Sequence, residues 1–480
     1  MKLWNKNNWH LLVVSSIYVI LTILCINDCY FWDTIQQVSK EAHWYFLSDF
    51  SSLLIPATQH ISSDIIATGY HPPLMGIMIA ALWKIIGYKL WVSHVFILLW
   101  GFVLIYNIWK IVKTRFPENL AGWVLLIILL EPTLLSQFSI ASPDFILFTA
   151  FVISLRAILN RKPWLLCVGI FFLCCINMRG IFAGGILFMS NIVFVYLQTH
   201  NIRSVYKTAL PYFPTFILLV AYFSYYFINH GWFFNNSADS FHYSLPRGVG
   251  SILKHLAEFG LRSIENGRFV IWLIGIFAAF NYRKLKEAFS PEYKIILAVF
   301  LLLTGLYLFF VFFTQMPFSA RYFMPQFFLL TLMTLAGITN LFEQKKLKIV
   351  VLIILCFELT GHFWIYPDKI AKSWDCTLAH LPYYELRKNC FQYIDHEKLN
   401  YRDISAGFCL YGNRRFTELG NINQSVGTRP DNKYFIYSNI SNLEDSFADE
   451  LKNKTHWIPI RSFEEGFVVI TIYKNLNYKN

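Results

Sequence analysis

The segment PPLMGIMIAALWKIIGYKLWVSHVFILLWGFVLIYNIW, residues 72–109, contains two apolar runs of unequal length. A helix needs about 20 apolar residues to cross a bilayer. The run 91–109 meets this requirement, whereas the run 72–87 is shorter and begins with two prolines. If the shorter run also crossed the membrane, every later loop would change sides. Its interpretation therefore determines the topology of the whole chain.

The rest of the sequence contains many runs like the longer one. The chain has 480 residues, of which 56% are hydrophobic and only 15% are charged, whereas soluble proteins carry roughly 25% charged residues. This composition excludes a soluble enzyme, a disordered chain and a disulfide-rich secreted domain. It predicts an α-helical polytopic membrane protein with candidate spans at 11–27, 91–109, 120–138, 145–159, 164–178, 181–197, 209–228, 267–280, 294–313, 323–341 and 348–366.

The loops between these runs divide the basic residues unevenly. If 72–87 lies in the membrane interface, one side receives every basic loop, which makes that side cytoplasmic by the positive-inside rule. The residues concerned are Lys2, Lys6, Lys110, Lys113, Arg115, Arg161, Lys162, Arg203, Lys207, Arg283, Lys284, Lys286, Lys345, Lys346 and Lys348. We therefore predict about eleven spans plus an interfacial helix, with a cytoplasmic N-terminus and an extracytoplasmic C-terminus.

From residue 367 the composition becomes polar. The formal net charge is +12, but residues 367–480 contain 15 Lys and Arg against 14 Asp and Glu, so the excess lies beside the apolar runs. Basic residues there set orientation, and no nucleic-acid partner is expected. We divide the chain into a transmembrane domain, 1–366, and an extracytoplasmic α/β domain, 367–480. Within the second domain the patterns predict helices at 376–398 and 443–454 and strands at 434–440 and 466–474.

The first outer loop, 28–70, is rich in carboxylates and includes Asp28 and Asp33. Asp33 lies in YFWDTIQQVSKEAHWYF, which has enough aromatic residues to lie along a membrane surface. A carboxylate held there, beside a groove reached from the lipid, could act as a general base on an acceptor hydroxyl. The alternative is a solvated acidic loop without a catalytic role.

Two further outer segments contain candidate polar residues. His71, in TGYHPPLMG, could bind a phosphate or an acceptor, or could simply cap or pack against the following helix. Asp144 follows Ser142 and Pro143 at the start of a predicted span. An Asp in that position is also typical of an ordinary helix cap.

Several cations lie on the side opposite to the basic loops. Arg179, in CINMRGIFAGG, and Arg321, in PFSARYFMPQF, lie at outer membrane boundaries, and Arg247 and Arg268 lie in or beside the loop 229–266. The positive-inside rule gives no reason for cations there. Snorkelling to headgroups is one explanation, and binding of a lipid-linked phosphate is another, because Arg matches phosphate oxygens with two hydrogen bonds. Tyr322, next to Arg321, would line the same pocket.

The order of these motifs resembles that of GT-C glycosyltransferases, which use polyprenyl-phosphate sugars. The similarity is greatest to the branch that contains protein O-mannosyltransferases and lipid A aminoarabinose transferases. It rests on FWDTI, GYHPPLM, SPDF, MRG and ARYFMP, in this order, and it covers roughly residues 10–345. We recognise no similarity in the tail.

The resemblance implies a catalytic base in the first loop and a second acidic position in the next outer turn. Asp33 matches the base best, with Asp28 as its competitor, and Asp144 matches the second position. Many relatives carry another acidic residue beside the first, but Trp32 and Thr34 flank Asp33 here. One carboxylate per loop makes a poor site for a divalent metal, so we expect no cofactor, and dependence on a divalent metal is the disfavoured alternative.

The implied activity is inverting transfer of a sugar from a polyprenyl-phosphate donor to a lipid, glycan or protein acceptor. The reaction would take place at the outer face of a bacterial inner membrane, among membrane lipids. A transporter or flippase of lipid-linked sugars is the alternative, and a non-catalytic membrane assembly protein is a third class. Transporters usually carry ionisable groups near the middle of the membrane, whereas the unusual charges here gather at one face, which favours an enzyme.

Overall fold

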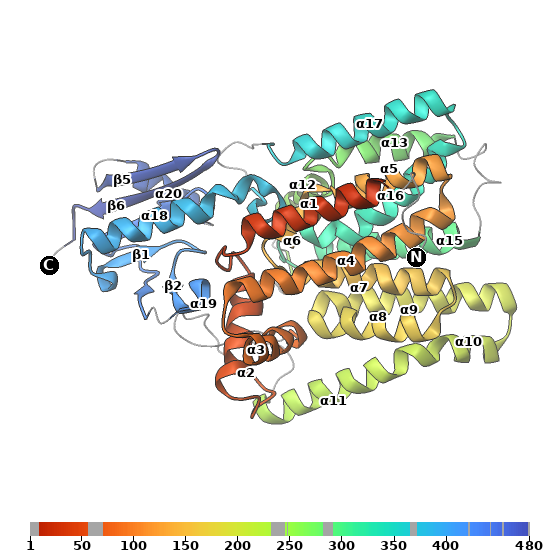
Figure 1. Ribbon diagram of the computed structural model, residues 1–480, viewed down its shortest axis with the longest axis horizontal. Coiled ribbons are helices and arrows are strands. Elements are labelled where there is room, and N and C mark those ends of the chain that lie inside the picture. The colour runs from red at the N-terminus through yellow and green to blue at the C-terminus, as the bar shows by residue number, and fades with distance from the viewer. Residues whose placement is uncertain are drawn as a thin grey trace.

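The computed structural model describes residues 9–55, 71–231, 245–246, 248–281, 291–364, 372–420, 423–441, 443–453 and 456–478. Most of the chain up to residue 361 is helical, and the long helices lie side by side along the long axis of the molecule (Figure 1). Apart from α2 (Glu41–Leu47) and α3 (Leu74–Ile86), the described α-helices of this part are α1 (Trp9–Cys25), α4 (Leu90–Arg115), α5 (Glu118–Leu129), α6 (Pro132–Ser139), α7 (Pro143–Leu159), α8 (Pro163–Ile176), α9 (Met178–Thr199), α10 (Ile202–Ala209), α11 (Phe213–His230), α12 (Val249–Ile264), α13 (Phe269–Phe280), α15 (Pro291–Phe313), α16 (Met324–Thr339) and α17 (Gln344–Gly361).

Each candidate span coincides with one of these helices, except 120–138, which covers α5 and α6, so the prediction of a polytopic α-helical membrane protein is confirmed. The helices are shorter than the predicted spans in several places. Within the described residues, five helices are long and apolar enough to cross a membrane, or seven if each of two bent pairs counts as one span. The helices α1 and α8 are apolar but fall below that length.

The two bent pairs are interruptions that the sequence analysis did not predict. The candidate span 120–138 forms α5 and α6, which meet at 56°, and α12 meets α13 at 92°. At the first break Glu131 caps α6, because its side chain accepts a hydrogen bond of 2.8 Å from the backbone N–H of Leu134. At the second break Gly267 has a φ of +88° and packs so closely on α17 that a Cβ would collide with a backbone carbonyl. Both breaks therefore place polar backbone and side chains at the same end of the bundle.

The ambiguous run 72–87 forms a short helix, α3 (Leu74–Ile86, 13 residues). At about 1.5 Å per residue it spans about 20 Å, which is less than the roughly 30 Å of a bilayer core. It packs on α2 (Glu41–Leu47), which follows a π-helix (Ile35–Lys40), and Gly76 of α3 allows the close approach to the side chain of Glu41. The length of α3 therefore agrees with an interfacial helix.

The C-terminal region forms a small α/β domain at one end of the bundle (Figure 1). Its main sheet consists, in spatial order, of β1 (Ile404–Ala406), β4 (Tyr434–Ser438), β6 (Val468–Asn475) and β5 (Trp457–Glu465). In this sheet β1 pairs parallel with β4, and the other pairs are antiparallel. The predicted helices appear as α18 (Pro382–His396) and α20 (Asp445–Lys452), and the predicted strands as β4 (Tyr434–Ser438) and β6 (Val468–Asn475). The structure adds β1 (Ile404–Ala406), β5 (Trp457–Glu465), a short pair β2 (Gly412–Asn413) and β3 (Ser425–Val426), and α19 (Arg415–Glu418).

The loop after α1 connects the two parts of the molecule. Phe31 and Trp32 are buried in the core of the C-terminal domain, where the Phe31 ring stacks on His380 at 5.0 Å between ring centroids. The backbone N–H of Tyr30 donates a 3.0 Å hydrogen bond to the carbonyl of Thr417. Trp32 has a φ of +54°, a conformation that non-glycine residues adopt rarely. This anchoring fixes the chain immediately before Asp33.

Candidate active site

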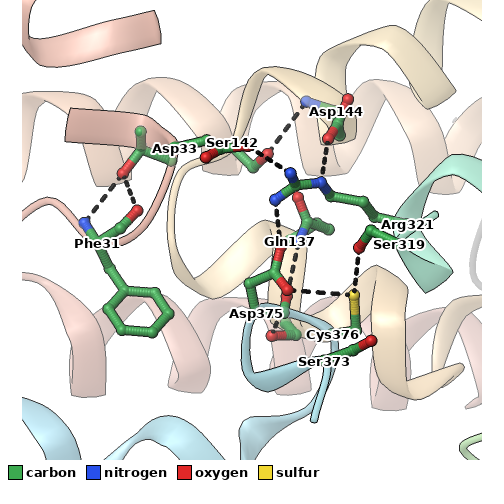
Figure 2. A network of polar contacts seen from close by, with 12 residues as sticks. Phe31, Asp33, Gln137, Ser142, Asp144, Ser319, Arg321, Ser373, Asp375 and Cys376 are labelled. Carbon is green, nitrogen blue, oxygen red and sulfur yellow. Dashed lines mark hydrogen bonds and ion pairs between the residues drawn. The ribbon is translucent and has the colours of Figure 1, made fainter. Parts of the chain in front are cut away.

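Arg321 lies at the centre of a buried ion-pair cluster formed by distant parts of the sequence (Figure 2). It belongs to a 3₁₀ turn, Ala320–Phe323, directly before α16. Its Nη2 pairs with Asp33, its Nη1 pairs with Asp375, and its Nε lies 3.2 Å from Oδ2 of Asp144. A single guanidinium group therefore joins the first loop, the start of α7 and the linker to the C-terminal domain.

Asp144 connects this arginine to a second one. Its Oδ1 lies 2.7 Å from Nη2 of Arg179, at the start of α9, and the Arg179 guanidinium lies 4.0 Å from the ring centroid of Tyr322. The side chain of Ser142 caps α7 by accepting a 3.1 Å hydrogen bond from the backbone N–H of Asp144. The Asp144 carboxylate is therefore not the helix cap and is directed to the two arginines.

Exposure differs sharply within the cluster. The side chains of Arg321, Asp144 and Asp375 are 6%, 5% and 4% exposed, whereas Asp33 is 33% exposed and Arg179 is 23% exposed. Asp33 and Arg179 are thus the members that are most accessible to an incoming molecule. With two arginines and three aspartates ionised, the formal charge of the cluster is 2 − 3 = −1.

His71 lies beside the same cluster. The backbone N–H of Met178 donates a long hydrogen bond of 3.5 Å to its Nδ1. Burial and the nearby positive charge of Arg179 lower the pKa of His71 to about 3, and Asp33 opposes this shift only in part. The ring is therefore neutral at physiological pH, so His71 can offer a hydrogen bond to a phosphate or a sugar but not a positive charge.

Asp28 lies apart from this cluster. Burial raises the pKa of its carboxyl to about 6, and a hydrogen bond with Cys25 opposes the shift. The carbonyl of Asp28 accepts a 3.2 Å hydrogen bond from Nε2 of His94. Of the two candidates for the base, only Asp33 is brought together with Asp144 and the arginines by an ion pair among the described residues.

Arg268 belongs to a second buried network, which contacts the turn that carries Arg321. Its Nε lies 2.9 Å from Oε1 of Glu131, and its Nη1 donates a 2.9 Å hydrogen bond to the carbonyl of Ala320. Arg268 is completely buried, so it supports the turn that carries Arg321 rather than facing open space. Its predicted contact with a phosphate stays a prediction. The remaining candidate, Arg247, lies outside the described residues.

Neither Asp375 nor Glu131 is among the site residues predicted from the sequence. Asp375 lies in the linker, in a region without recognised motifs, and Glu131 lies inside a stretch that was assigned to one continuous span. The sequence offers one weak signal for each residue. Asp375 is an acidic residue between Trp374 and Cys376, and Glu131 is an acidic residue followed by a proline inside an apolar run. Among the described residues, no group of three or more His, Cys, Asp or Glu side chains could hold a metal ion.

The fold is similar to that of two solved structures of one protein, ArnT. Over 98% of both chains, it matches ArnT from Cupriavidus metallidurans bound to undecaprenyl phosphate with a TM-score of 0.52 and 11% sequence identity. The apo state of the same protein matches with a TM-score of 0.53 and 12% identity, over 96% of this chain and 97% of that one. No protein-family model and no curated protein sequence matches the chain. The structural match confirms the GT-C-like fold that the sequence motifs predict.

Proposed function

We propose that this protein is an integral-membrane glycosyltransferase that uses a polyprenyl-phosphate sugar as donor. The observation that carries the proposal is the partly exposed Asp33 carboxylate, held by Arg321 next to Asp144 and Arg179. The fold supports it, because a protein with a similar fold and length has been solved with undecaprenyl phosphate bound. The acceptor is a hydroxyl group of a lipid, a glycan or a protein.

In the proposed reaction Asp33 acts as the general base. The acceptor oxygen forms a bond to the anomeric carbon, while the bond between that carbon and the donor phosphate oxygen breaks. The acceptor proton passes to the Asp33 carboxylate, and the electron pair of the broken bond leaves with the phosphate. Since one displacement takes place from the face opposite the leaving group, the anomeric configuration inverts. Asp33 is suited to this role because it is the most exposed carboxylate of the cluster.

The phosphate needs positive charge and hydrogen-bond donors where the leaving group develops its charge. Arg179 can supply the charge, because its guanidinium is partly exposed and is shared with only one carboxylate in the ion pairs of the described residues. Neutral His71 can donate a hydrogen bond from the ring beside it. Arg321 completes the set, and we propose that it contacts the phosphate on the side that faces Asp33.

The test is transfer by the purified full-length protein, measured with a panel of radiolabelled polyprenyl-phosphate sugars and lipid, glycan and peptide acceptors. The matched control is Asp49→Asn, which makes the same chemical change in the same loop at a side chain that is 80% exposed. Donor-dependent transfer that Asp49→Asn keeps and Asp33→Asn loses would support the proposal. Movement of lipid-linked sugar across vesicles without transfer would favour a flippase instead.

The proposed orientation places the cluster at the outer face of a bacterial inner membrane. It can be tested with single cysteines at Phe50, Pro430, Arg115 and Lys346, each compared with the unmodified protein to correct for native thiols. Cysteines at 50 and 430 should react with an impermeant reagent in intact cells, and those at 115 and 346 only after permeabilisation. Reaction of 50 and 346 from the same side would mean that 72–87 crosses the membrane.

A further inference from the structure

The linker to the C-terminal domain delivers Asp375 into the cluster. Asp375 lies in a 3₁₀ turn, Trp374–Cys376, and its carboxylate pairs with Nη1 of Arg321. Its carboxylate is 4% exposed, so solvent screens this pair little. Figure 2 shows Asp375 on the side of the Arg321 guanidinium opposite to Asp144. It is the one member of the cluster that comes from outside the helical bundle.

The turn that carries Asp375 is held firmly against α6. The carbonyl of Asp375 accepts hydrogen bonds of 2.8 Å from Oγ of Ser136 and 2.6 Å from Nε2 of Gln137. The next residue is fixed as well, since Sγ of Cys376 lies 3.5 Å from Oγ of Ser319, two residues before Arg321. These contacts fix the backbone on which Asp375 lies, so the position of its carboxylate beside Arg321 is determined by the fold.

We propose that Asp375 is a positioning residue through which the C-terminal domain holds Arg321 against Asp33. The guanidinium has three nitrogens, and each of them faces a different carboxylate. Because Asp375 occupies Nη1, it fixes the rotation of the planar group and directs Nη2 to Asp33. This inference rests on the proposed function, since it assigns Asp375 a role in the same reaction.

The charge of Asp375 has a second consequence. With this carboxylate present the cluster carries a formal charge of −1, which opposes the binding of a phosphate. The variant Asp375→Asn would make the cluster neutral and release Nη1, so a phosphate would bind more tightly. The same variant would leave Arg321 free to rotate away from Asp33, and small misplacements at a reacting centre are costly. Tighter binding together with slower turnover is therefore the signature of a positioning role.

The pH dependence of turnover provides an independent readout. Asp375 now shares the positive charge of Arg321 with Asp33 and Asp144. In Asp375→Asn the cluster carries one negative charge fewer, and a lower negative charge favours the deprotonated form of a base that acts there. The other titratable groups that face the cluster, besides Arg179, are His71, Tyr307, Tyr322, Cys376, Cys409 and Tyr411. The substitution leaves all of these in place, and the acid limb should move to lower pH.

The experiment compares the wild type with Asp375→Asn and with Asp431→Asn, an exposed aspartate of the same domain that serves as control. Affinity is measured with polyprenyl phosphate by thermal shift, and turnover is measured with the sugar donor across pH. We expect about threefold tighter binding, about tenfold lower kcat and an acid limb lower by about half a pH unit. Asp375→Glu, which restores the charge, should return the acid limb to its wild-type position.

Each outcome bears on the inference. Unchanged or weaker binding, wild-type turnover or an unmoved acid limb in Asp375→Asn would overturn it. If Asp375→Asn does not fold, Asp375→Glu is the test, because the longer side chain should displace Arg321 and slow turnover while keeping the acid limb. Wild-type turnover by Asp375→Glu would then overturn the inference. A wild type that neither binds polyprenyl phosphate nor transfers sugar would instead defeat the proposed function, and the inference with it.

Discussion

Two buried arginines at the same end of the bundle have similar surroundings and different access. Arg321 is 6% exposed and Arg268 is completely buried, and each pairs with a carboxylate that lies far away in the sequence, Asp33 and Glu131 respectively. The Arg321 cluster includes Asp33 and Arg179, which are 33% and 23% exposed, whereas both partners in the Arg268–Glu131 pair are at most 4% exposed. A buried ion pair is therefore a candidate site only where some of its members can contact a substrate.

The second buried network, formed by Arg268 and Glu131 and called the sealed network below, stabilises the breaks in the two bent helix pairs. Glu131 caps α6 at the break in the first bent pair, and Arg268 joins this cap to the turn that carries Arg321. A neighbouring pair, Arg262 with Glu265 at 2.8 Å, lies at the second break. Both breaks expose backbone groups inside the bundle, and buried polar groups need partners there. The sealed network therefore supports the turn that carries Arg321. Arg321, Asp33, Asp144, Asp375 and Arg179 are called the open cluster below.

The largest expected effect concerns the sealed network. Arg268→Met would leave Glu131 buried without its cation, and breaking one partner of a buried pair costs about 3–5 kcal/mol. We expect a much lower unfolding temperature in detergent. Arg203→Ala, at an exposed arginine on α10, is the control for loss of charge. If both variants unfold at the same temperature, the sealed network contributes nothing to stability.

The next effect concerns the base. Asp33→Asn keeps the hydrogen-bonding shape of the side chain but cannot accept the acceptor proton, so turnover should fall by about 10²-fold or more. Polyprenyl-phosphate binding should be kept or become tighter, because the substitution also removes one negative charge from the cluster, and the unfolding temperature should change little. Asp28→Asn should be milder. The opposite result, with Asp28→Asn inactive and Asp33→Asn active with an acid limb near pH 6, would identify Asp28 as the base, because the pKa of Asp28 is raised to about 6.

A smaller effect is expected for the phosphate contact of the open cluster. Arg321→Ala should weaken donor binding by about 1.5–3 kcal/mol, the range for a hydrogen bond to a charged group. Arg321→Lys should restore only part of the affinity, because an ammonium cannot reproduce the planar fork. The measurement is donor affinity separated from turnover. If neither Arg321→Ala nor Arg179→Ala changes the affinity, the phosphate binds to other cations of the outer face.

The sequence contained enough information for the helical part of the fold, because apolar length and basic loops report directly on membrane crossing. It also placed Asp33, Asp144, Arg179 and Arg321 on one face, and the structure brings these four together. The breaks were not predicted, since an apolar run that bends at Glu131 has the same composition as one that stays straight. Periodicity does not report on such a bend.

Asp375 could not be predicted for a different reason. Its sequence position, far from Arg321, says nothing about their contact, which depends on the linker turn being pinned to α6 by Ser136 and Gln137. The same holds for Phe31 and Trp32, whose aromatic character predicted a membrane surface. They are instead buried in the C-terminal domain, because the loop after α1 packs against it and Tyr30 donates a backbone hydrogen bond to Thr417. Long-range packing of this kind leaves no local pattern.

The smallest expected effect belongs to His71, at the edge of the open cluster. Its pKa is lowered to about 3, so the native ring is neutral above that value, while the unfolded chain takes up a proton near pH 6.5. The native state is therefore penalised as the pH falls below 6.5, and His71→Gln should lose less stability in acid than the wild type. A neutral hydrogen bond contributes about 0.5–1.5 kcal/mol, so donor affinity should fall by about threefold to tenfold.

The decisive measurement for His71 is the pH profile of donor affinity. Because the ring does not titrate between pH 5 and pH 8 in the native protein, the wild type and His71→Gln should give parallel profiles over that range. Parallel profiles would assign the positive charge of the site to the arginines, since they stay protonated throughout the range. A wild-type inflection near pH 6.5 that His71→Gln abolishes would mean that His71 carries charge. The open cluster would then bind phosphate with a third cation, and its affinity would rise steeply in mild acid.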